Sequence, residues 1–462
     1  MNRIILIAAA ALALIPALAL AESGALKLPA YKQFELKNGA KVFIMETREV
    51  PLVTLRLLLP AGSAMDDPAS EGVANLTGRL LQKGAAALTE DQISEMIEDV
   101  GGRIDVRTGR DYTLVNGDFL AKDMGRALDI MGKVVLSPDF PKDAFDREKG
   151  LVVAEIQADR EQPMAVASKQ FARVLMGDHP YAHPVEGGEA SVSALTREKV
   201  IEFYKKRYVP AGSLIAIVGD VDAGKALDLV KKTFEGWKGE ASAQSIPALA
   251  ARTSPGRKLY VIDKPDATQS QIRIGNLAVG RSSPEHFPLL VANNVLGGGF
   301  TSRLMNEIRV NRGLSYGARS DLSELKAGGF FGVTTFTKNK TLRETIDVAL
   351  DQLKRIRTEK MNDAELTSSK KYLSGLFPFD VETNNDLAGW LVDLSFYALP
   401  VDYVEGYRRH VDAVTPDEAM KVADEHFLLD DNVILLLTNY TEVKDQLKGL
   451  GEAQVLSIDQ VK

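Results

Sequence analysis

Arg309 and Tyr316 are two side chains that can donate hydrogen bonds to the same acceptor. They lie seven residues apart, after the consecutive glycines Gly297, Gly298 and Gly299. An arginine guanidinium and a phenol hydroxyl both donate to a carbonyl oxygen, or to the oxyanion that forms when the carbonyl is attacked. Each type also has an ordinary structural use, because an arginine at a helix end can offset the helix dipole and a tyrosine in a strand commonly packs. Taken together behind the glycines, we interpret the two residues as a binding pair.

Local pattern predicts the elements that carry this pair. Leu304 and Ile308 lie four residues apart and give their segment one apolar face, which indicates a helix. Gly313 is expected to end this helix, and Tyr316 to begin a strand. Arg312 belongs to the same segment, but we predict that it takes no part in binding.

Two acidic residues form a second candidate set. Glu148 and Glu155 lie seven residues apart in a segment with helical character, so they share one face of the helix. In isolation, two solvated helix acids would explain them. Their spacing from an earlier segment, residues 72–84, gives them a further meaning.

Residues 72–84 have the sequence Gly-Val-Ala-Asn-Leu-Thr-Gly-Arg-Leu-Leu-Gln-Lys-Gly. This segment resembles the His-x-x-Glu-His segment of the pitrilysin/insulinase family of zinc peptidases, the inverzincins, whose usual form is Gly-Leu-Ala-His-Phe-Leu-Glu-His-Met-Leu-Phe-Lys-Gly. Asn75 and Arg79 stand at its two histidine positions, and Gly78 stands at the glutamate that activates the zinc-bound water. The segment therefore keeps the family's frame and lacks its catalytic and zinc-binding side chains.

The resemblance implies roles for the other candidates. Glu155, 76 residues after Arg79, falls where the family's third zinc ligand lies, and Glu148 falls at its supporting carboxylate. We regard both acids as vestigial and predict no metal in this chain. Because a buried carboxylate needs a compensating charge, we predict that Arg79 pairs with Glu155 or Glu148 and substitutes for the metal; the alternative is an exposed arginine without a fixed partner. Arg309 and Tyr316 match the family's substrate-binding pair, and the preceding glycines match its Gly-rich loop.

The histidines offer no clear metal site elsewhere. Of the five, only His179 and His183 are close in sequence. They lie four residues apart, but Pro180 and Pro184 disfavour a continuous helix, so the spacing does not assure ligand geometry. The family has a similar His-Pro-Tyr turn without a metal role. We predict a structural role for both histidines.

Composition and the first residues limit the class of protein and its compartment. With 462 residues, 45% of them apolar and 26% charged, the chain is typical of a globular protein of several domains. A net charge of -7 with scattered lysines and arginines argues against a nucleic-acid partner. Arg3, an apolar run at 4–15 broken by Pro16, and an Ala-x-Ala pattern predict a signal peptide over residues 1–21, a periplasmic location and no membrane anchor after cleavage. The absence of cysteine is compatible with an oxidising compartment.

An internal repeat predicts the domain organisation. Pairing Arg56 with Arg273 aligns two strand-like segments at an offset of 217 residues, and pairing Thr196 with Thr415 aligns a helix and a strand at an offset of 219. Two segments whose offsets agree within two residues favour a duplication over two unrelated domains. We therefore predict an α+β fold of two duplicated halves, each with antiparallel-leaning sheets packed against helices. Their expected ranges are 22–240 for the first half, 241–256 for a linker rich in small residues and proline, and 257–462 for the second half.

The resemblance also implies a divided function. Family members enclose an unfolded peptide in a clam-shell, and several bacterial members place the zinc motif in one chain and the Arg/Tyr pair in another. This chain has the second pattern and would form half of the clam-shell. We predict a noncatalytic, substrate-binding subunit of a heteromeric periplasmic zinc metallopeptidase that cleaves peptides or unfolded polypeptides, with zinc held by a homologous partner chain. The substrate is expected to lie extended along a sheet edge. A structural core protein and a peptide-binding homodimer without proteolysis are the alternatives.

Overall fold

The computed structural model describes residues 26–240, 245–249 and 256–461. The predicted signal peptide, residues 1–21, lies outside these residues, as does part of the predicted linker. Within the described ranges, no helix combines the length and the apolar character needed to cross a membrane.

The first half is built on a six-stranded sheet in which most neighbours are antiparallel. Only β2 and β8 pair in parallel. The strands in spatial order are β1 (Tyr31–Glu35), β2 (Lys41–Glu46), β8 (Leu214–Gly219), β3 (Leu52–Leu59), β7 (Thr113–Leu120) and β6 (Arg103–Thr108). A short hairpin of β4 (Gly84–Ala85) and β5 (Leu88–Thr89) lies apart from this sheet.

The second half contains an equivalent sheet. Its strands in spatial order are β11 (Ala318–Leu325), β12 (Gly328–Lys338), β10 (Gln269–Ala278), β13 (Val433–Thr438), β9 (Lys258–Asp263) and β14 (Ala453–Ser457). The central strand β10 is antiparallel to both neighbours, as β3 is in the first sheet. The sheets differ at one edge, because β1 is antiparallel to β2 whereas β14 is parallel to β9.

Strand register confirms the predicted duplication. Arg56 on β3 lies opposite Asn116 and Ala216. Arg273 on β10 lies opposite Thr334 and Leu435, which follow those partners by 218 (334 minus 116) and 219 (435 minus 216) residues. The strand partners are thus offset by nearly the same number of residues as the two sequence matches, and the α+β fold of two duplicated, mainly antiparallel sheets is confirmed.

Helices cover the two sheets. In the first half, α1 carries the segment that resembles the zinc motif, and α4 carries Glu148 and Glu155. The helices of this half are α1 (Val73–Leu80), α2 (Glu90–Glu98), α3 (Met124–Leu136), α4 (Lys142–Arg160), α5 (Pro163–Met176), α6 (Glu189–Ala194), α7 (Arg197–Arg207) and α8 (Ala223–Phe234). Those of the second half are α9 (His286–Asn293), α10 (Leu342–Thr358), α11 (Asp363–Leu376), α12 (Asn384–Phe396), α13 (Asp402–Glu405), α14 (Tyr407–Ala413), α15 (Pro416–His426) and α16 (Tyr440–Val443), with two π-helical segments, η3 (Asn294–Gly298) and η4 (Met305–Asn311).

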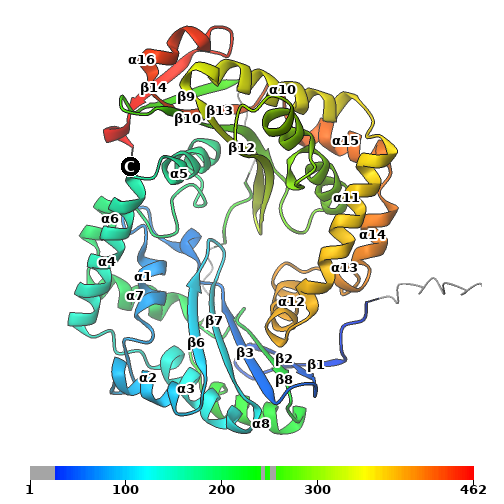
Figure 1. The fold of residues 1–462 in the computed structure, drawn as a ribbon. Helices are drawn as coiled ribbons and strands as arrows, with labels where there is room; N and C mark the ends of the chain where they lie inside the picture. The colour runs from blue at the N-terminus through cyan, green and yellow to red at the C-terminus, as the bar shows by residue number, and fades with distance from the viewer. Residues whose placement is uncertain (1–25, 241–244, 250–255, 462) are drawn as a thin grey trace, which may run out of the picture.

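Each half contributes one helix that packs on the sheet of the other half. Helix α5 of the first half packs on β10 and β13 of the second sheet, and α12 of the second half packs on β3 and β8 of the first sheet (Figure 1). Alternate residues of β2 therefore face different cores: Val42 and Ile44 pack with helices of their own half, whereas Phe43 and Met45 join the core around α12. Each sheet is buried on both faces only when the other half is present.

The duplicated arginines fasten these exchanged helices. Arg273 donates through Nη2 to the carbonyl of Met164 at 3.1 Å and to Ser168 Oγ at 3.1 Å, both on α5. Arg56 donates through Nη2 to Asn385 Oδ1 on α12 at 2.8 Å. The two equivalent residues therefore reach equivalent partners, each in the opposite half.

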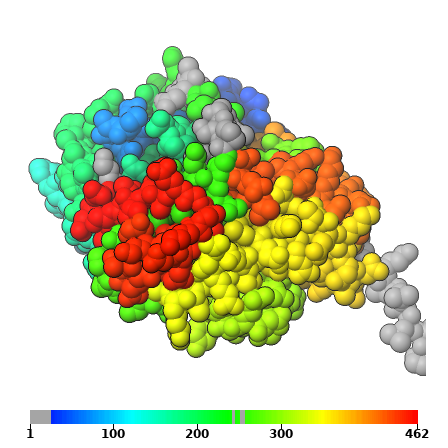
Figure 2. All heavy atoms as spheres, turned by 90° about the horizontal axis from the view of Figure 1, so that it is seen from above, coloured from blue at the N-terminus to red at the C-terminus, as the bar shows by residue number. Residues whose placement is uncertain are grey.

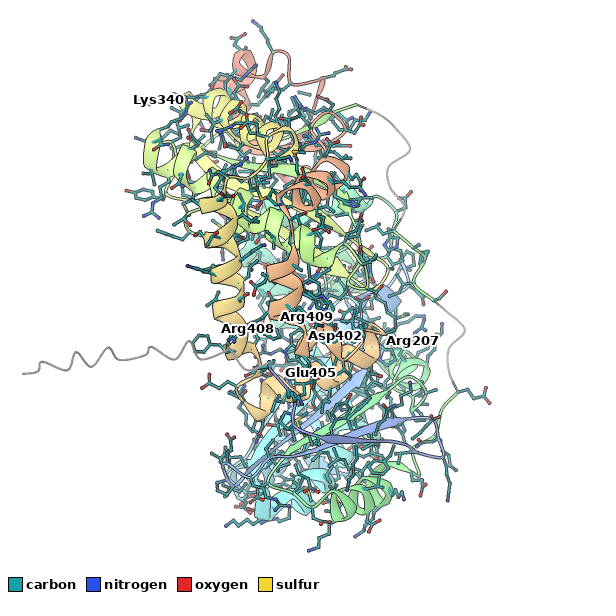
Figure 3. All side chains as sticks on the ribbon, turned by 90° about the vertical axis from the view of Figure 1, so that its right-hand side faces the viewer. Arg207, Lys340, Asp402, Glu405, Arg408 and Arg409 are labelled. Atoms are coloured by element: carbon teal, nitrogen blue, oxygen red, sulfur yellow. The ribbon has the colours of Figure 1, made fainter. Side chains whose placement is uncertain are left out.

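Further contacts join the ends of the chain to the second half. Figure 2, seen from above, shows the C-terminal segment in red beside the yellow surface of α10. Arg343 of α10 donates to the carbonyls of Gln446 and Lys448 in that segment. Near the start of the described chain, the amide of Leu28 donates to Glu405 of α13 at 3.2 Å, in the region of labelled charged side chains in Figure 3.

Candidate functional site

The buried side chain of Asp66 accepts hydrogen bonds at the start of helix α1. Asp66 accepts hydrogen bonds from the amides of Gly72 at 2.7 Å and Ala74 at 3.0 Å, which satisfies donors at the start of the helix. Burial raises the pKa of Asp66 to about 8, although the two amide hydrogen bonds act in the opposite direction. Gly72 has a φ of +94°, a backbone conformation that favours glycine.

Arg79 points to both acids of α4, which confirms the predicted ion pair. Its Nη1 and Nη2 lie 2.9 and 3.0 Å from the two carboxylate oxygens of Glu155, and its Nε lies 3.1 Å from Glu148 Oε2. Both acids are engaged, rather than one or the other. Burial lowers the pKa of Arg79, but the hydrogen bonds to Glu155 and Glu148 outweigh it and raise the pKa above its ordinary value.

A second cation completes the network. Lys83 lies 3.3 Å from the other oxygen of Glu148 and 2.5 Å from Glu90, which also pairs with Arg147. Glu148 has a side chain only 6% exposed, so its charge is neutralised from both sides by Arg79 and Lys83. No motif or spacing in the sequence relates Lys83 or Glu90 to Glu148, because Lys83 follows α1 and Glu90 begins α2, and only tertiary packing brings them to α4.

The residues of this site do not fit a zinc ion. Arginine has no lone pair to offer a metal, and the half-buried Asn75 is not among the nitrogen, thiolate and carboxylate ligands that zinc prefers. The two remaining carboxylates are held by cations. The arrangement is chemically a closed set of ion pairs between α1 and α4.

The position of the catalytic glutamate is closed by packing. A Cβ atom on Gly78 would lie 2.6 Å from Thr108 Oγ1 on β6. Thr108 Oγ1 is itself 3.0 Å from Thr113 Oγ1, whose hydroxyl donates to the carbonyl of Ala61. Strand β6 therefore approaches α1 at the one residue where it has no side chain.

The glycine-rich segment is helical rather than a loop. The π-helical segment η3 includes Gly297 and Gly298, and its last turn closes at Gly299. A Cβ atom on Gly297 would lie 2.3 Å from the backbone nitrogen of Ser320, so only glycine allows this approach to β11. Segments of π-helix are frequent at functional sites, which fits the interpretation of this region.

The helix that follows has the apolar face predicted for it. Leu304 and Ile308 are fully buried, and the helical segment η4 ends before Gly313, whose φ is +61°. The expectation that Tyr316 begins a strand is wrong, because β11 begins at Ala318. Tyr316 lies in the preceding turn, where its side chain is 85% exposed.

Arg309 and Tyr316 line one pocket of about 400 Å³. The full lining is Gln269, Arg309, Gly313, Leu314, Ser315, Tyr316, Phe336, Thr337 and Lys338. The Arg309 guanidinium lies 5.3 Å from the centre of the Phe300 ring, a cation–π contact with a residue that is itself 69% exposed. The pair is thus brought together with its donors open to solvent.

Arg312 has different surroundings. It lies 3.7 Å from Glu307 and 3.4 Å from Glu344, and it lines another pocket. These exposed ion pairs are consistent with its exclusion from the binding pair.

The histidines behave differently from one another. Residues 178–184 form turns, and both ring nitrogens of His179 are engaged, with the carbonyl of Pro247 at 2.9 Å and the amide of Tyr181 at 3.1 Å. Within the described ranges, one group that sequence spacing did not indicate, Glu285, Glu425 and His426, has ligand atoms within 4.8 Å of one another. His426 Nε2 lies 2.8 Å from Glu285 Oε2, within hydrogen-bonding distance.

Comparison with known proteins gives the family. The model of the insulinase family, peptidase family M16, matches residues 41–189, and the model of the peptidase M16 inactive domain matches residues 194–373. An uncharacterized zinc protease of Mycobacterium leprae is 28% identical over 397 residues, 84% of this chain and 88% of that protein. One of Bacillus subtilis is 23% identical over 357 residues, 77% and 85% of the two chains.

Solved structures share the fold. The peptidase M16 inactive domain from Pseudomonas fluorescens has a TM-score of 0.82 and 28% identity, and the comparison covers 88% of this chain and 97% of that one. A protease from Helicobacter pylori has a TM-score of 0.81 at 21% identity, covering 89% and 100%. The chain belongs to the insulinase family of peptidases, M16, as its sequence indicated.

Proposed function

We propose that this chain is a noncatalytic, substrate-binding subunit of a heteromeric zinc metallopeptidase. A homologous partner chain with an intact His-x-x-Glu-His segment would hold the zinc and cleave peptides or unfolded polypeptides. The observation that carries the proposal is the contrast between the two candidate sites. At α1 the ion pairs of Arg79 fill the family's metal site, whereas Arg309 and Tyr316 line an open pocket.

The substrate-binding role rests on donors that have no acid partner. Within the described ranges, Arg309 forms no salt bridge, so its guanidinium can donate to a peptide carbonyl or to the oxyanion formed during cleavage. The Tyr316 hydroxyl adds a second donor at the same pocket. An extended substrate would add main-chain hydrogen bonds along a sheet edge, and β6 and β11 are edge strands.

The cellular location is part of the proposal. The apolar run at 4–15 and the Ala-x-Ala pattern support export to a periplasm, and the lack of cysteine is compatible with it. Secretion of a fusion of residues 1–30 to a reporter that is active only after export would support this location. Retention of the fusion in the cytoplasm would contradict it.

The central test is reconstitution with the partner. The full chain, affinity-purified from its native envelope fraction, should bring with it a homologue that contains His-x-x-Glu-His. Hydrolysis of an unfolded polypeptide should be much faster with both chains than with either alone. Arg309→Ala or Tyr316→Phe should lower kcat/KM of the pair by about tenfold to several hundredfold, since each removes a donor aimed at the reacting carbonyl.

Controls separate binding from assembly. Arg312→Ala removes a neighbouring arginine outside the pocket and should leave activity unchanged, while gel filtration should show the same complex for all variants. A partner that is fully active alone would refute the subunit role. Stoichiometric zinc in this chain together with cleavage would refute the noncatalytic assignment, and unchanged activity of both variants would favour a structural core role.

A further inference from the structure

Lys338 adds a second positive charge to the pocket of Arg309 and Tyr316. It is the last residue of β12 and lies opposite Gln269 at the start of β10. None of the nine lining residues is acidic, so the pocket carries two cations and no neutralising side chain. The sequence did not indicate Lys338, which is 22 residues beyond Tyr316 and reaches the pocket only through the β11–β12 hairpin.

The two cations differ from their neighbours in having no acid partner. Arg312 pairs with Glu344, and Arg319 lies 3.0 Å from Asp321. Within the part of the chain that the structure describes, neither Arg309 nor Lys338 has a carboxylate oxygen within 4.0 Å. Two unneutralised cations at one concave surface attract an anion, and the pocket focuses their field.

We propose that this pocket binds a carboxylate of the peptide substrate, held jointly by Arg309 and Lys338. This inference rests on the proposed function and names the substrate class: peptides with an acidic side chain or a free C-terminal carboxylate. A guanidinium has five N–H donors, so Arg309 can bind a carboxylate oxygen and a peptide carbonyl at once. Phe336 and Leu314 give the pocket an apolar wall for the methylene groups of a glutamate.

Four labelled peptides of equal length and extended, neutral sequence would test the proposal. One has an internal glutamate and an amidated end, the second has glutamine at that position and an amidated end, and the third has glutamine and a free C-terminal carboxylate. The fourth combines glutamate with the free carboxylate. Fluorescence anisotropy would measure the Kd of each for the full mature chain, alone and with the zinc-free partner.

At least one carboxylate should tighten binding about fivefold to tenfold over the glutamine amide, and added salt should reduce this difference. The peptide with the internal glutamate and the peptide with the free C-terminus each contain one kind of carboxylate. The one that binds more tightly than the second peptide shows which carboxylate the pocket recognises. Lys338→Gln should abolish most of the gain, and Lys338→Arg should retain it. Lys340, labelled in Figure 3, is an exposed lysine two residues away that lines a different pocket, so Lys340→Gln should keep the full gain.

Failure of the two proposals would look different. Equal Kd values for all four peptides, or a gain that Lys338→Gln does not change, would overturn carboxylate recognition while leaving peptide binding intact. Binding of none of the peptides, alone or in the pair, would overturn the substrate-binding function as well.

Discussion

A guanidinium can take the place of a metal ion only if it neutralises the carboxylates that would otherwise bind the metal. At Arg79 this condition is fulfilled in geometry, because both oxygens of Glu155 and one of Glu148 lie within hydrogen-bonding distance. The planar fork of arginine suits two carboxylates better than an ammonium would. Arg79 therefore forms ion pairs that hold α1 against α4, in place of a zinc ligand.

Arg79→Ala should lower the free energy of unfolding by about 2 kcal/mol. The variant leaves Glu148, whose side chain is 6% exposed, with Lys83 as its one remaining cation. The effect should fall short of the roughly 3–5 kcal/mol seen when a buried ion pair loses its sole partner. Urea denaturation followed by circular dichroism would measure it.

Two further variants check this reason. Arg312→Ala removes an arginine with exposed ion pairs and should change stability by less than about 0.5 kcal/mol. In a Glu148→Gln background the buried charge is absent, so Arg79→Ala should cost less than in the natural chain. An equal cost in both backgrounds would contradict the proposed role of Glu148.

At the scale of elements, the distance between α1 and β6 decides what α1 can carry. Gly78 is a helix residue whose Cβ position is already taken by Thr108. Gly150 is also a helix residue, on α4, but no atom lies within 4 Å of its Cβ position. Substitution by alanine at both sites therefore separates the cost of close packing at Gly78 from the intrinsic helix preference of alanine at Gly150.

Gly78→Ala should destabilise the protein by about 1–3 kcal/mol, because overpacking forces β6 or α1 to move. Gly150→Ala should stabilise it by about 0.5–1 kcal/mol, since alanine is the better helix former. Thermal unfolding of both variants would show shifts of opposite sign. Stabilisation by both would mean that Thr108 moves without cost and that packing does not close the Cβ position of residue 78.

At the scale of the whole molecule, the exchanged helices make the two halves interdependent. Without α12, the first sheet would expose Phe43, Met45 and Leu58, and without α5 the second would expose Leu435 and Leu437. Large contiguous apolar faces drive aggregation when they are exposed to solvent. The linker joins two sheets that already depend on each other's helices.

Separate production of residues 22–249 and 256–462 tests this dependence. Each fragment alone should aggregate, whereas co-expression should give a soluble one-to-one complex on gel filtration with the far-ultraviolet circular dichroism of the intact chain. A single substitution tests the contact itself. Ser168→Ala in the first fragment removes an acceptor of Arg273 on α5 and should weaken the complex. A stable, monomeric first fragment would contradict the exchange as a requirement for folding.

Much of the fold was open to prediction because its signals are local or repeated. Two pairs of matching segments at nearly the same offset were enough to predict two duplicated halves. Leu304 with Ile308 was enough to predict a helix. Tyr316 was misplaced at a strand start because the turn at 313–317 depends on packing, not on β preference. The helix exchange left no local signal, since α5 and α12 have the same apolar patterns whichever sheet they cover.

The sequence by itself determined the family frame, the missing zinc ligands, the duplication and the candidate pair Arg309 and Tyr316, because residue identity and spacing carry this information directly. Tertiary structure alone decided that Arg79 meets both acids with Lys83 beside it, that Thr108 closes the space at Gly78, and that Lys338 joins the pocket. These facts join residues on separate elements, and only the packing of the whole chain fixes the distances between them.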